Sequence, residues 1–560
     1  MNDTSKRSPG EGPIPSDLLD VVVVGAGLGG LYMLYRLRKA GFRVKVFEAG
    51  GGVGGTWYWN RYPGARCDIE SMEYSYSFDD ELQQEWEWPE RYATQPVILD
   101  YVNHVADRFD LRRDITFDTR IKTATFEPSA EVWTLIADGL PPIRARWCVM
   151  ATGNLSTPQT PDFKGLESFE GDWYHTGMWP HEGVDLSGKR VAVVGTGSTA
   201  IQMIPKIAAQ ADHLHVFQRT ANFSLPARNA PMDKERERAF KATYPERRAE
   251  ARRTSFGVSG YPLPTQSALE VSKEELVARF QALWDEGGTI GFLTCFNDFL
   301  VSEEANEVAA EFVRGKIRET VNDPEVAHLL CPNDHPIGSK RLCLDTGYYE
   351  TYNRDNVTLV NARATPIIEI TPKGIRTTDA EVEVEVDVIA FATGFDAMTG
   401  SLREIDISVA GGERLRDKWE GGPLTYLGLM VNGFPNMFLI TGPGSPSVKS
   451  QMIHSIEQHA DWISDCIEYM RENCITAIEP EAEAEMRWVL HVNEVADGTL
   501  YPRANSWYVG ANIPGKPRVF MPYVAGTSVY REKCDRIAAA GYEGFKLTTE
   551  SNPASAAAGS

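Results

Sequence analysis

Residues 20–30 read Asp-Val-Val-Val-Val-Gly-Ala-Gly-Leu-Gly-Gly. The β-branched valines predict a short strand, and the apolar pattern of residues 31–37 predicts a helix after the glycines. Gly25 permits the tight turn, Gly27 lets backbone N–H groups approach a pyrophosphate, and Gly30 permits close packing of helix on strand. The stretch therefore predicts the start of a dinucleotide-binding βαβ unit.

The second strand of this unit ends in an acid. Gly41 stops the helix, and residues 44–48 read Val-Lys-Val-Phe-Glu. Glu48 at this place would accept hydrogen bonds from the ribose of an adenosine. A glycine pattern alone is a weak signal, but the acid at this spacing strengthens the prediction of nucleotide binding.

A segment rich in glycine and aromatic residues follows at positions 54–68. Its glycines allow close approach of a ligand, and its aromatic side chains can wall a flat ring, with Thr56 and Trp57 as candidate contacts. A packed aromatic loop without a ligand is the alternative. Asp68 ends the segment, and a buried carboxylate there needs a cationic partner.

A second nucleotide unit starts with the strand-like residues 190–194. Its turn and helix start contain Gly195, Gly197 and Ser198. The next strand, residues 213–217, is followed by Gln218, Arg219 and Thr220 where the first unit has its acid. A guanidinium can bind a 2′-phosphate that a carboxylate would repel, so this unit predicts NADPH rather than NADH.

Between the two units, residues 169–180 read Phe-Glu-Gly-Asp-Trp-Tyr-His-Thr-Gly-Met-Trp-Pro. Two glycines, a terminal proline and unevenly spaced aromatic residues predict a packed connection rather than regular structure. The spacing is FxGxxxHxxxWP, carried by Phe169, Gly171, His175 and Trp179.

This pattern resembles the fingerprint of type I Baeyer–Villiger monooxygenases, and the aromatic segment resembles their FAD-binding segment. The sequences Ala-Thr-Gly at 151–153 and at 392–394 resemble the two hinges of these flavoproteins. Similarity runs in the family's order from about residue 20 to about residue 545 and is greatest to the phenylacetone and steroid monooxygenase branch. The resemblance implies FAD, NADPH and O2 as reactants. It also implies oxidation of a ketone to an ester or lactone through a C4a-peroxyflavin that attacks the carbonyl.

The resemblance also implies roles for particular residues. Lys340 would contact the coenzyme 2′-phosphate, and Arg341 would be the catalytic arginine near the flavin, paired with Asp68. Trp507 would lie over the bound nicotinamide nucleotide. For His175 no proton transfer is assigned. From the residues alone, Lys340 and Arg341 could be two exposed surface cations, and the tryptophan could simply fill a core.

Residues 447–452 are the expected wall of the substrate site. The candidate contacts are Ser447, Val448, Lys449 and Met452. Lys449 is the charged member, and two interpretations stay open: it points to solvent, or it favours ketones that carry a carboxylate.

At 560 residues the chain should form two or three domains. We expect an α/β fold with two dinucleotide-binding, Rossmann-like domains and a helical insertion in the second. The expected parts are an FAD-binding domain at 18–150 and 386–548, an NADP-binding domain at 151–228 and 330–385, the insertion at 229–329, and disordered tails at 1–17 and 549–560.

Charge and cysteine usage limit the class of partner. A formal net charge of -22 disfavours nucleic acid and anionic membranes, so the expected partners are a small-molecule ketone and O2. The chain shows no leader-like start, and its most apolar window, residues 18–37, is broken by charges and glycines. The eight cysteines include no CxxC pair, which favours reduced thiols in the cytoplasm and no metal site. Oligomeric state stays open.

Three other functions remain. An N- or S-oxygenating flavin monooxygenase also uses two nucleotide units, although its related fingerprint lacks the tryptophan found here at 179. A flavin disulfide reductase is disfavoured because CxxC is absent. A flavin-binding redox sensor would need neither Arg341 nor Asp68.

Overall fold

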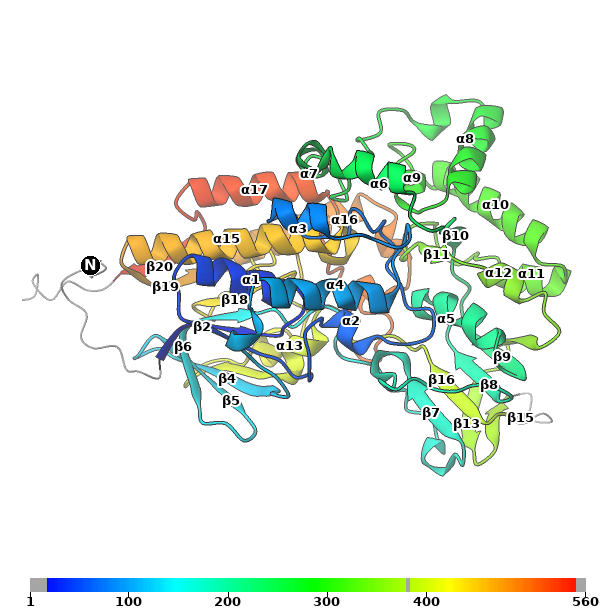
Figure 1. Ribbon diagram of the computed structural model, residues 1–560, viewed down its shortest axis with the longest axis horizontal. Coiled ribbons are helices and arrows are strands. Elements are labelled where there is room, and N and C mark those ends of the chain that lie inside the picture. Colours follow the sequence, from blue (N-terminus) through cyan, green and yellow to red (C-terminus); the bar gives the residue numbers. More distant parts are fainter. Residues whose placement is uncertain (1–17, 379–382, 550–560) are drawn as a thin grey trace, which may run out of the picture.

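The computed structural model describes residues 18–378 and 383–549 of the chain. The predicted tails at 1–17 and 550–560 lie outside the described residues, and Thr549 is the last residue of strand β20. Two sheets lie side by side along the longest axis of the molecule (Figure 1). Each forms on one of the two nucleotide units that the sequence predicts.

The first sheet has the strand order β17-β4-β5-β6-β1-β2-β3, with β18 also paired to β6. β1 runs parallel to both β2 and β6, so the glycine turn after β1 opens at the carboxyl edge of a parallel core. The strand bounds are β1 Leu18–Val24, β2 Val44–Phe47, β3 Ile115–Thr116, β4 Ile121–Glu127, β5 Val132–Ala137, β6 Ile143–Met150, β17 Asp406–Val409 and β18 Met437–Leu439.

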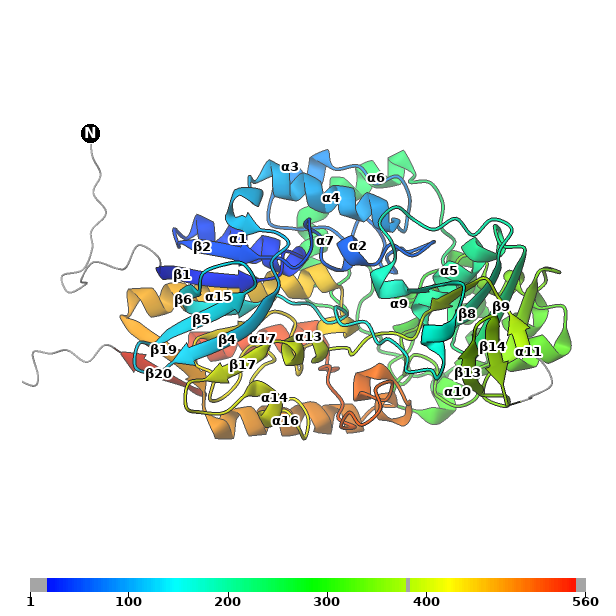
Figure 2. The same ribbon diagram turned by 90° about the horizontal axis from the view of Figure 1, so that it is seen from below.

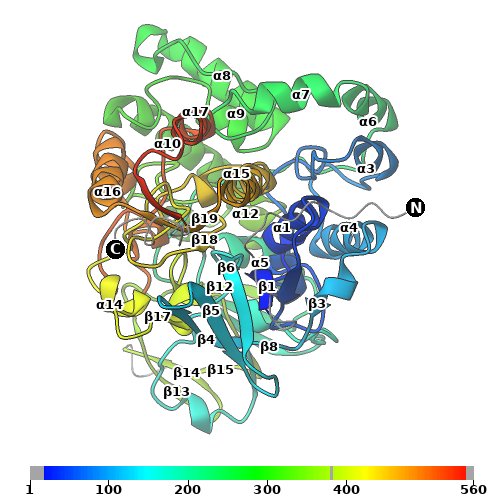
Figure 3. The ribbon, with the colours of Figure 1, turned by 90° about the vertical axis from the view of Figure 1, so that its left-hand side faces the viewer.

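Helices cover this sheet in layers, as Figures 1 and 3 show. α1 (Leu28–Lys39) packs on β1 and β2, α15 (Met452–Glu472) packs on α1, and α17 (Thr527–Ala539) packs on α15. Both α1 and α15 are largely buried, which explains their many apolar residues. The other helices of this half are α2 Thr56–Trp59, α3 Asp80–Glu85, α4 Gln95–Arg108, α13 Gly400–Glu404, α14 Leu415–Lys418 and α16 Ala482–Asp497.

The second sheet has the order β12-β9-β8-β16-β7, all parallel, and Figure 2 shows it beside the first sheet. Its strands are β7 Asp172–His175, β8 Arg190–Val194, β9 His213–Gln218, β12 Val357–Asn361 and β16 Val388–Phe391, and α5 (Ser198–Ala208) follows β8. The smaller sheets pair β10 Ser224–Pro226 with β11 Cys343–Asp345, join β13 Ile367–Thr371, β14 Gly374–Thr377 and β15 Glu383–Glu385, and pair β19 Ile475–Pro480 with β20 Phe545–Thr549.

The position of β16 corrects one predicted boundary. The sequence predicts that the chain returns to the first domain at residue 386, but Val388 pairs with Val191 of β8 and with Asp172 of β7. The strand is therefore the centre of the second sheet, and the return follows Phe391. A short, fully apolar run suits the interior of either parallel sheet, so its composition does not identify the sheet.

The charged run expected as one helical insertion divides between the two halves. Phe240 and Tyr244 of the first two helices are buried in the core of the first half, whereas Phe280 and Val313 of later helices are buried in the core of the second half. The insertion therefore bridges the two nucleotide units. Its helices are α6 Lys234–Lys241, α7 Tyr244–Ala251, α8 Lys273–Glu286, α9 Ile290–Leu293, α10 Glu303–Thr320 and α11 Pro324–Leu330, and α12 Tyr348–Thr351 lies just beyond it.

None of the helices in residues 18–378 and 383–549 combines the length and the apolar character that crossing a bilayer requires.

Candidate active site

One long pocket of about 620 Å³ follows the carboxyl edge of the first sheet. It is lined by the loops after β1, β2 and β6, which is the edge where parallel sheets bind ligands. Gly25, Gly27, Glu48, Thr56 and Trp57 all line it. These residues, predicted from separate motifs, thus surround a single cavity.

The glycines leave backbone exposed where a side chain could not fit. Gly25 has φ +104°, and a Cβ there would lie 2.5 Å from the Ala151 oxygen. A Cβ on Gly30 would lie 1.8 Å from the oxygen of Gly25, so α1 sits directly on the turn. Gly27 faces Gly55, whose added Cβ would come within 2.9 Å of its Cα. The bare backbone between these two loops fits a dinucleotide phosphate bridge.

Glu48 is buried at the far end of the pocket. Its two carboxylate oxygens accept hydrogen bonds from the backbone N–H of Ala26 at 2.6 Å and of Gly50 at 2.7 Å. Burial raises the pKa of Glu48, while these two hydrogen bonds lower it. Each oxygen retains a lone pair, so the carboxylate fits a ribose diol.

Trp57 forms part of the opposite end of the pocket. Its indole is buried, and its Nε1 donates a 3.1 Å hydrogen bond to the hydroxyl of Tyr74. Tyr74 also lines the pocket, although no motif in the sequence marks it. A flat ring system fits this aromatic end.

Arg341 and Asp68 pair with each other, as the family resemblance implies, and although neither lines the pocket, Arg341 contacts Val448, which does. Arg341 Nε and Nη2 donate to the two Asp68 oxygens at 2.8 and 2.7 Å, and Nη1 donates to the Val448 carbonyl at 2.7 Å. Burial lowers the pKa of Arg341, whereas the charge and the hydrogen bonds of Asp68 raise it. The net shift of the pKa is upward. The guanidinium is therefore a fixed cation beside Val448, which lines the pocket.

The second nucleotide turn repeats the geometry of the first. Gly195 has φ +115°, and a Cβ there would lie 2.6 Å from the Ala392 oxygen. A Cβ on Gly197, at the start of α5, would meet nothing within 4 Å, so the helix N-terminus is open to a phosphate. The Ser198 hydroxyl lies 3.0 Å from Cys343 Sγ, and the Thr220 carbonyl accepts from the Thr196 hydroxyl at 2.7 Å.

Cations from three loops gather beside this turn. Burial lowers the pKa of Lys340; Asp334 raises it, and the nearby Arg219 and Arg363 lower it again. Arg219 and Arg363 are both exposed. Arg363, which follows β12, was missed from the sequence because no glycine or strand-end motif marks it. The cluster fits a dianionic 2′-phosphate.

The fingerprint residues lie in and around β7, at the edge of the second sheet. Phe169 packs on the core beside Phe391, and a Cβ on Gly171 would lie 2.4 Å from the Asp387 oxygen. His175 is buried and its Nδ1 accepts from the Gly177 N–H at 3.0 Å. Trp179 is buried in the core of the second half. The four fingerprint residues thus pack within the second half of the molecule, and none of them lines the pocket.

The expected substrate wall is a 3-10 turn (Ser447–Lys449) leading into α15. Val448 and Met452 line the pocket, while the buried Ser447 hydroxyl accepts from Asn154 Nδ2 at 2.6 Å. Of the two interpretations of Lys449, the one in which its side chain points to solvent is wrong, because its ammonium group packs against two tyrosine rings. Its Nζ lies 4.1 Å from the ring centre of Tyr501 and 4.8 Å from that of Tyr508.

Trp507 lies in a short turn (Trp507–Val509) that packs with Val448 and Met452. The loop that carries it is attached to the second hinge, because Lys516 Nζ pairs with Asp396 at 2.5 Å and Asn512 Nδ2 donates to the Phe395 carbonyl at 2.7 Å. Trp507 does not itself line the pocket, but its cluster includes Val448, whose carbonyl accepts from Arg341.

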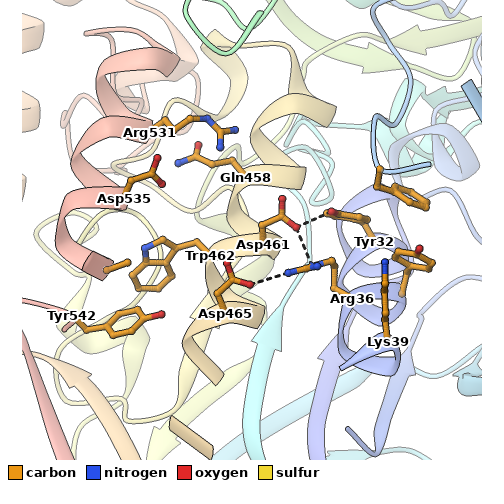
Figure 4. Close-up of a pocket in the computed structure, with 13 residues that line it drawn as sticks. Tyr32, Arg36, Lys39, Gln458, Asp461, Trp462, Asp465, Arg531, Asp535 and Tyr542 are labelled. Carbon is orange, nitrogen blue, oxygen red and sulfur yellow. Dashed lines mark hydrogen bonds and ion pairs between the residues drawn. The ribbon is translucent and has the colours of Figure 1, made fainter. Parts of the chain in front are cut away.

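A second hollow lies between α1, α15 and α17 (Figure 4). Arg36 points to Asp461 and Asp465 there, at 3.0 and 2.8 Å, and the Tyr32 hydroxyl also donates to Asp461. The residues that line it include neither nucleotide turn. This hollow is separate from the nucleotide pocket, and its central arginine is already neutralised.

Two dinucleotide folds that meet at one aromatic pocket, with a fixed arginine at its end, define a flavin- and nicotinamide-dependent oxidoreductase. Residues 23–82 match the family described as an NAD(P)-binding Rossmann-like domain. The chain is 44% identical over 527 residues to a Baeyer-Villiger monooxygenase of Pseudooceanicola batsensis, covering 93% of this chain and 95% of the relative. It is also 41% identical over 533 residues, covering 95% and 97%, to the phenazine N-monooxygenase PhzNO1 of Lysobacter antibioticus.

Solved structures agree over the whole fold. An oxidized steroid monooxygenase bound to NADP has a TM-score of 0.90 and 51% identity, with 95% of this chain and 99% of that chain covered. OTEMO in complex with FAD and NADP has a TM-score of 0.91 and 42% identity, with the same coverage. The chain belongs to the Baeyer–Villiger monooxygenase family.

Proposed function

We propose that this protein oxidises ketones to esters or lactones, with FAD in the long pocket and NADPH over the second nucleotide turn. One observation carries the assignment of the site: Arg341, from the second half of the chain, reaches Asp68 of the first half and the Val448 carbonyl at the rim of the pocket. Bound FAD, once reduced by NADPH, supplies the electrons that activate O2 for insertion beside a carbonyl.

Arg341 has donors left for a reacting oxygen. A guanidinium carries five N–H groups, and three of those in Arg341 are taken by Asp68 and Val448. The remaining two can stabilise negative charge on the oxygen of the substrate, and the guanidinium stays cationic at any working pH. Asp68 holds the plane of the guanidinium in place, which makes it a positioning residue.

Apolar side chains at the Arg341 end of the pocket would help to exclude water once substrate and cofactors are bound. Val448, Met452 and Trp507 belong to one apolar cluster at the Arg341 end. Water excluded from this end cannot compete for the donors of Arg341, so their interaction with a charged oxygen is stronger than in solvent.

Arg219, Lys340 and Arg363 would bind the coenzyme 2′-phosphate, and Trp507 would cover its nicotinamide half. No carboxylate ends β9, where the first unit has Glu48, and the nearby acid, Asp334, lies 3.5 Å from Arg363, so the three cations outnumber it.

The assignment is tested by incubating the FAD-loaded protein with NADPH, O2 and a panel of neutral ketones. We expect one ester or lactone formed for each NADPH consumed, detected by mass spectrometry. The same reactions are run with a tertiary amine, a sulfide and an aromatic N-heterocycle. Products from these three substrates with no ester from any ketone would show an N- or S-oxygenating enzyme instead.

A further inference from the structure

Lys449 is a cation without an acidic partner next to the proposed reaction site. In the part of the chain that the structure describes, no carboxylate oxygen lies within ion-pair distance of its Nζ. The nearby acid, Asp68, has both oxygens on Arg341. With Lys449 protonated, these three side chains carry two positive charges and one negative charge.

The surroundings keep this ammonium in place but do not neutralise it. The rings of Tyr501 and Tyr508, both buried, lie 4.1 and 4.8 Å from Nζ, a distance at which a cation is attracted to an aromatic face. Burial and the charge of Arg341 both lower the pKa of Lys449. An anion bound beside it would relieve both effects.

The position of Lys449 along the chain connects it to the substrate. It directly follows Val448, whose side chain lines the pocket and whose carbonyl accepts from Arg341. Arg341 is bonded to the carbonyl of Val448 and Lys449 is the next residue, so the two side chains are close enough to bind two oxygen-bearing groups of the same small molecule.

We propose that Lys449 binds a carboxylate on the substrate, so that the preferred substrates are ketones that carry a carboxylate, with their carbonyl toward Arg341. This inference rests on the proposed function, because it assigns the substrate class of the same site. The tyrosine rings would align the ammonium, and the carboxylate would supply the missing negative charge.

The test compares (2-oxocyclopentyl)acetate with its methyl ester, which differ in charge but little in shape. For the wild-type protein we expect a kcat/KM at least tenfold higher for the acid. Lys449→Met should remove that preference, so that the ratio of kcat/KM for the acid to kcat/KM for the ester falls about tenfold, which is about 1.4 kcal/mol; the test is this ratio, whatever change the variant causes with the ester alone. Lys449→Arg should keep most of the preference.

The matched control is Lys39→Met, which removes one positive charge from an exposed position at the end of α1. It should leave both substrates unchanged. If Lys39→Met lowers the rate with the acid as much as Lys449→Met does, the effect is one of net charge, and the proposed contact is wrong.

Binding separates this inference from the proposed function. Calorimetry on the FAD-loaded protein should show that the acid binds at least tenfold more tightly than the ester, and that Lys449→Met abolishes the difference. Equal affinity of the wild-type protein for acid and ester would overturn the inference even if both were oxygenated. Tight, lysine-dependent binding of the acid without any oxygenation would instead contradict the proposed function.

Discussion

Two buried histidines serve as backbone hydrogen-bond acceptors rather than proton carriers. His175 Nδ1 accepts from Gly177, and His459 Nδ1 accepts from the Thr441 N–H at 2.9 Å. Burial lowers the pKa of His175 to about 4 and that of His459 to about 3. Both rings are therefore neutral at neutral pH, which agrees with a reaction site that depends on Arg341 for positive charge.

The low pKa of His459 predicts a pH-dependent loss of stability. The unfolded chain binds a proton at His459 below about pH 6.5, whereas the folded chain does not until about pH 3, so folding is favoured less as pH falls between these values. One such histidine contributes about 1.4 kcal/mol per pH unit in this window. His459→Gln should reduce the slope of unfolding free energy against pH by that amount, measured by urea unfolding between pH 4.5 and 6. An unchanged slope would show that the ring is protonated in the folded protein.

At the scale of elements, the loops after β9 and β12 and the segment before β11 supply the three cations of the proposed phosphate site. Replacing Arg219 or Lys340 by Ala should raise the KM for NADPH about tenfold per lost charged contact and leave the KM for NADH unchanged, because only NADPH carries the 2′-phosphate. Arg363→Ala should behave in the same way. Steady-state kinetics with both coenzymes measure this, and equal effects on the two would rule out the phosphate contact.

The turn between β1 and α1 leaves no room for a methyl group at Gly30, whose added Cβ would lie 1.8 Å from a backbone oxygen. Gly30→Ala should therefore displace the helix, cost about 1–3 kcal/mol of stability and release FAD. Flavin absorbance per protein and the thermal midpoint are the measurements. Gly315→Ala, in α10 with nothing within 4 Å, is the control and should stabilise the protein by about 1 kcal/mol. Full flavin content in Gly30→Ala would contradict this geometry.

Local sequence patterns predicted the elements better than their partners. The glycine turns and α1 follow from patterns contained in one segment, because glycine placement and apolar spacing act locally. The sheet to which β16 belongs is decided by its pairing with Val191 of β8 and Asp172 of β7, both more than 190 residues earlier in the chain. The four apolar residues of β16 would suit either sheet, so its sequence does not indicate which one it joins. Lys449 was recognised as unusual, but its two tyrosine neighbours come from a separate loop.

In the whole molecule, the proposed reaction site exists only where the two halves meet. Asp68 follows the FAD loop, Arg341 follows the bridging insertion, and Val448 precedes α15. Tyr62 and Gln202 also join the halves, through a 2.8 Å hydrogen bond from the tyrosine hydroxyl to the amide oxygen. The fold thus places Arg341, which comes from the half with the second nucleotide turn, beside the pocket of the first half.

The most direct measurement of the role of Arg341 is the ester formed per NADPH consumed by FAD-loaded Arg341→Ala, with a neutral ketone and O2. The flavin of this variant should still be bleached by NADPH under nitrogen, because the coenzyme contacts remain. Its ester yield should fall at least a hundredfold below that of the wild-type protein, since the donors for the charged oxygen are lost. A wild-type yield of ester from Arg341→Ala would contradict the assigned role of the arginine.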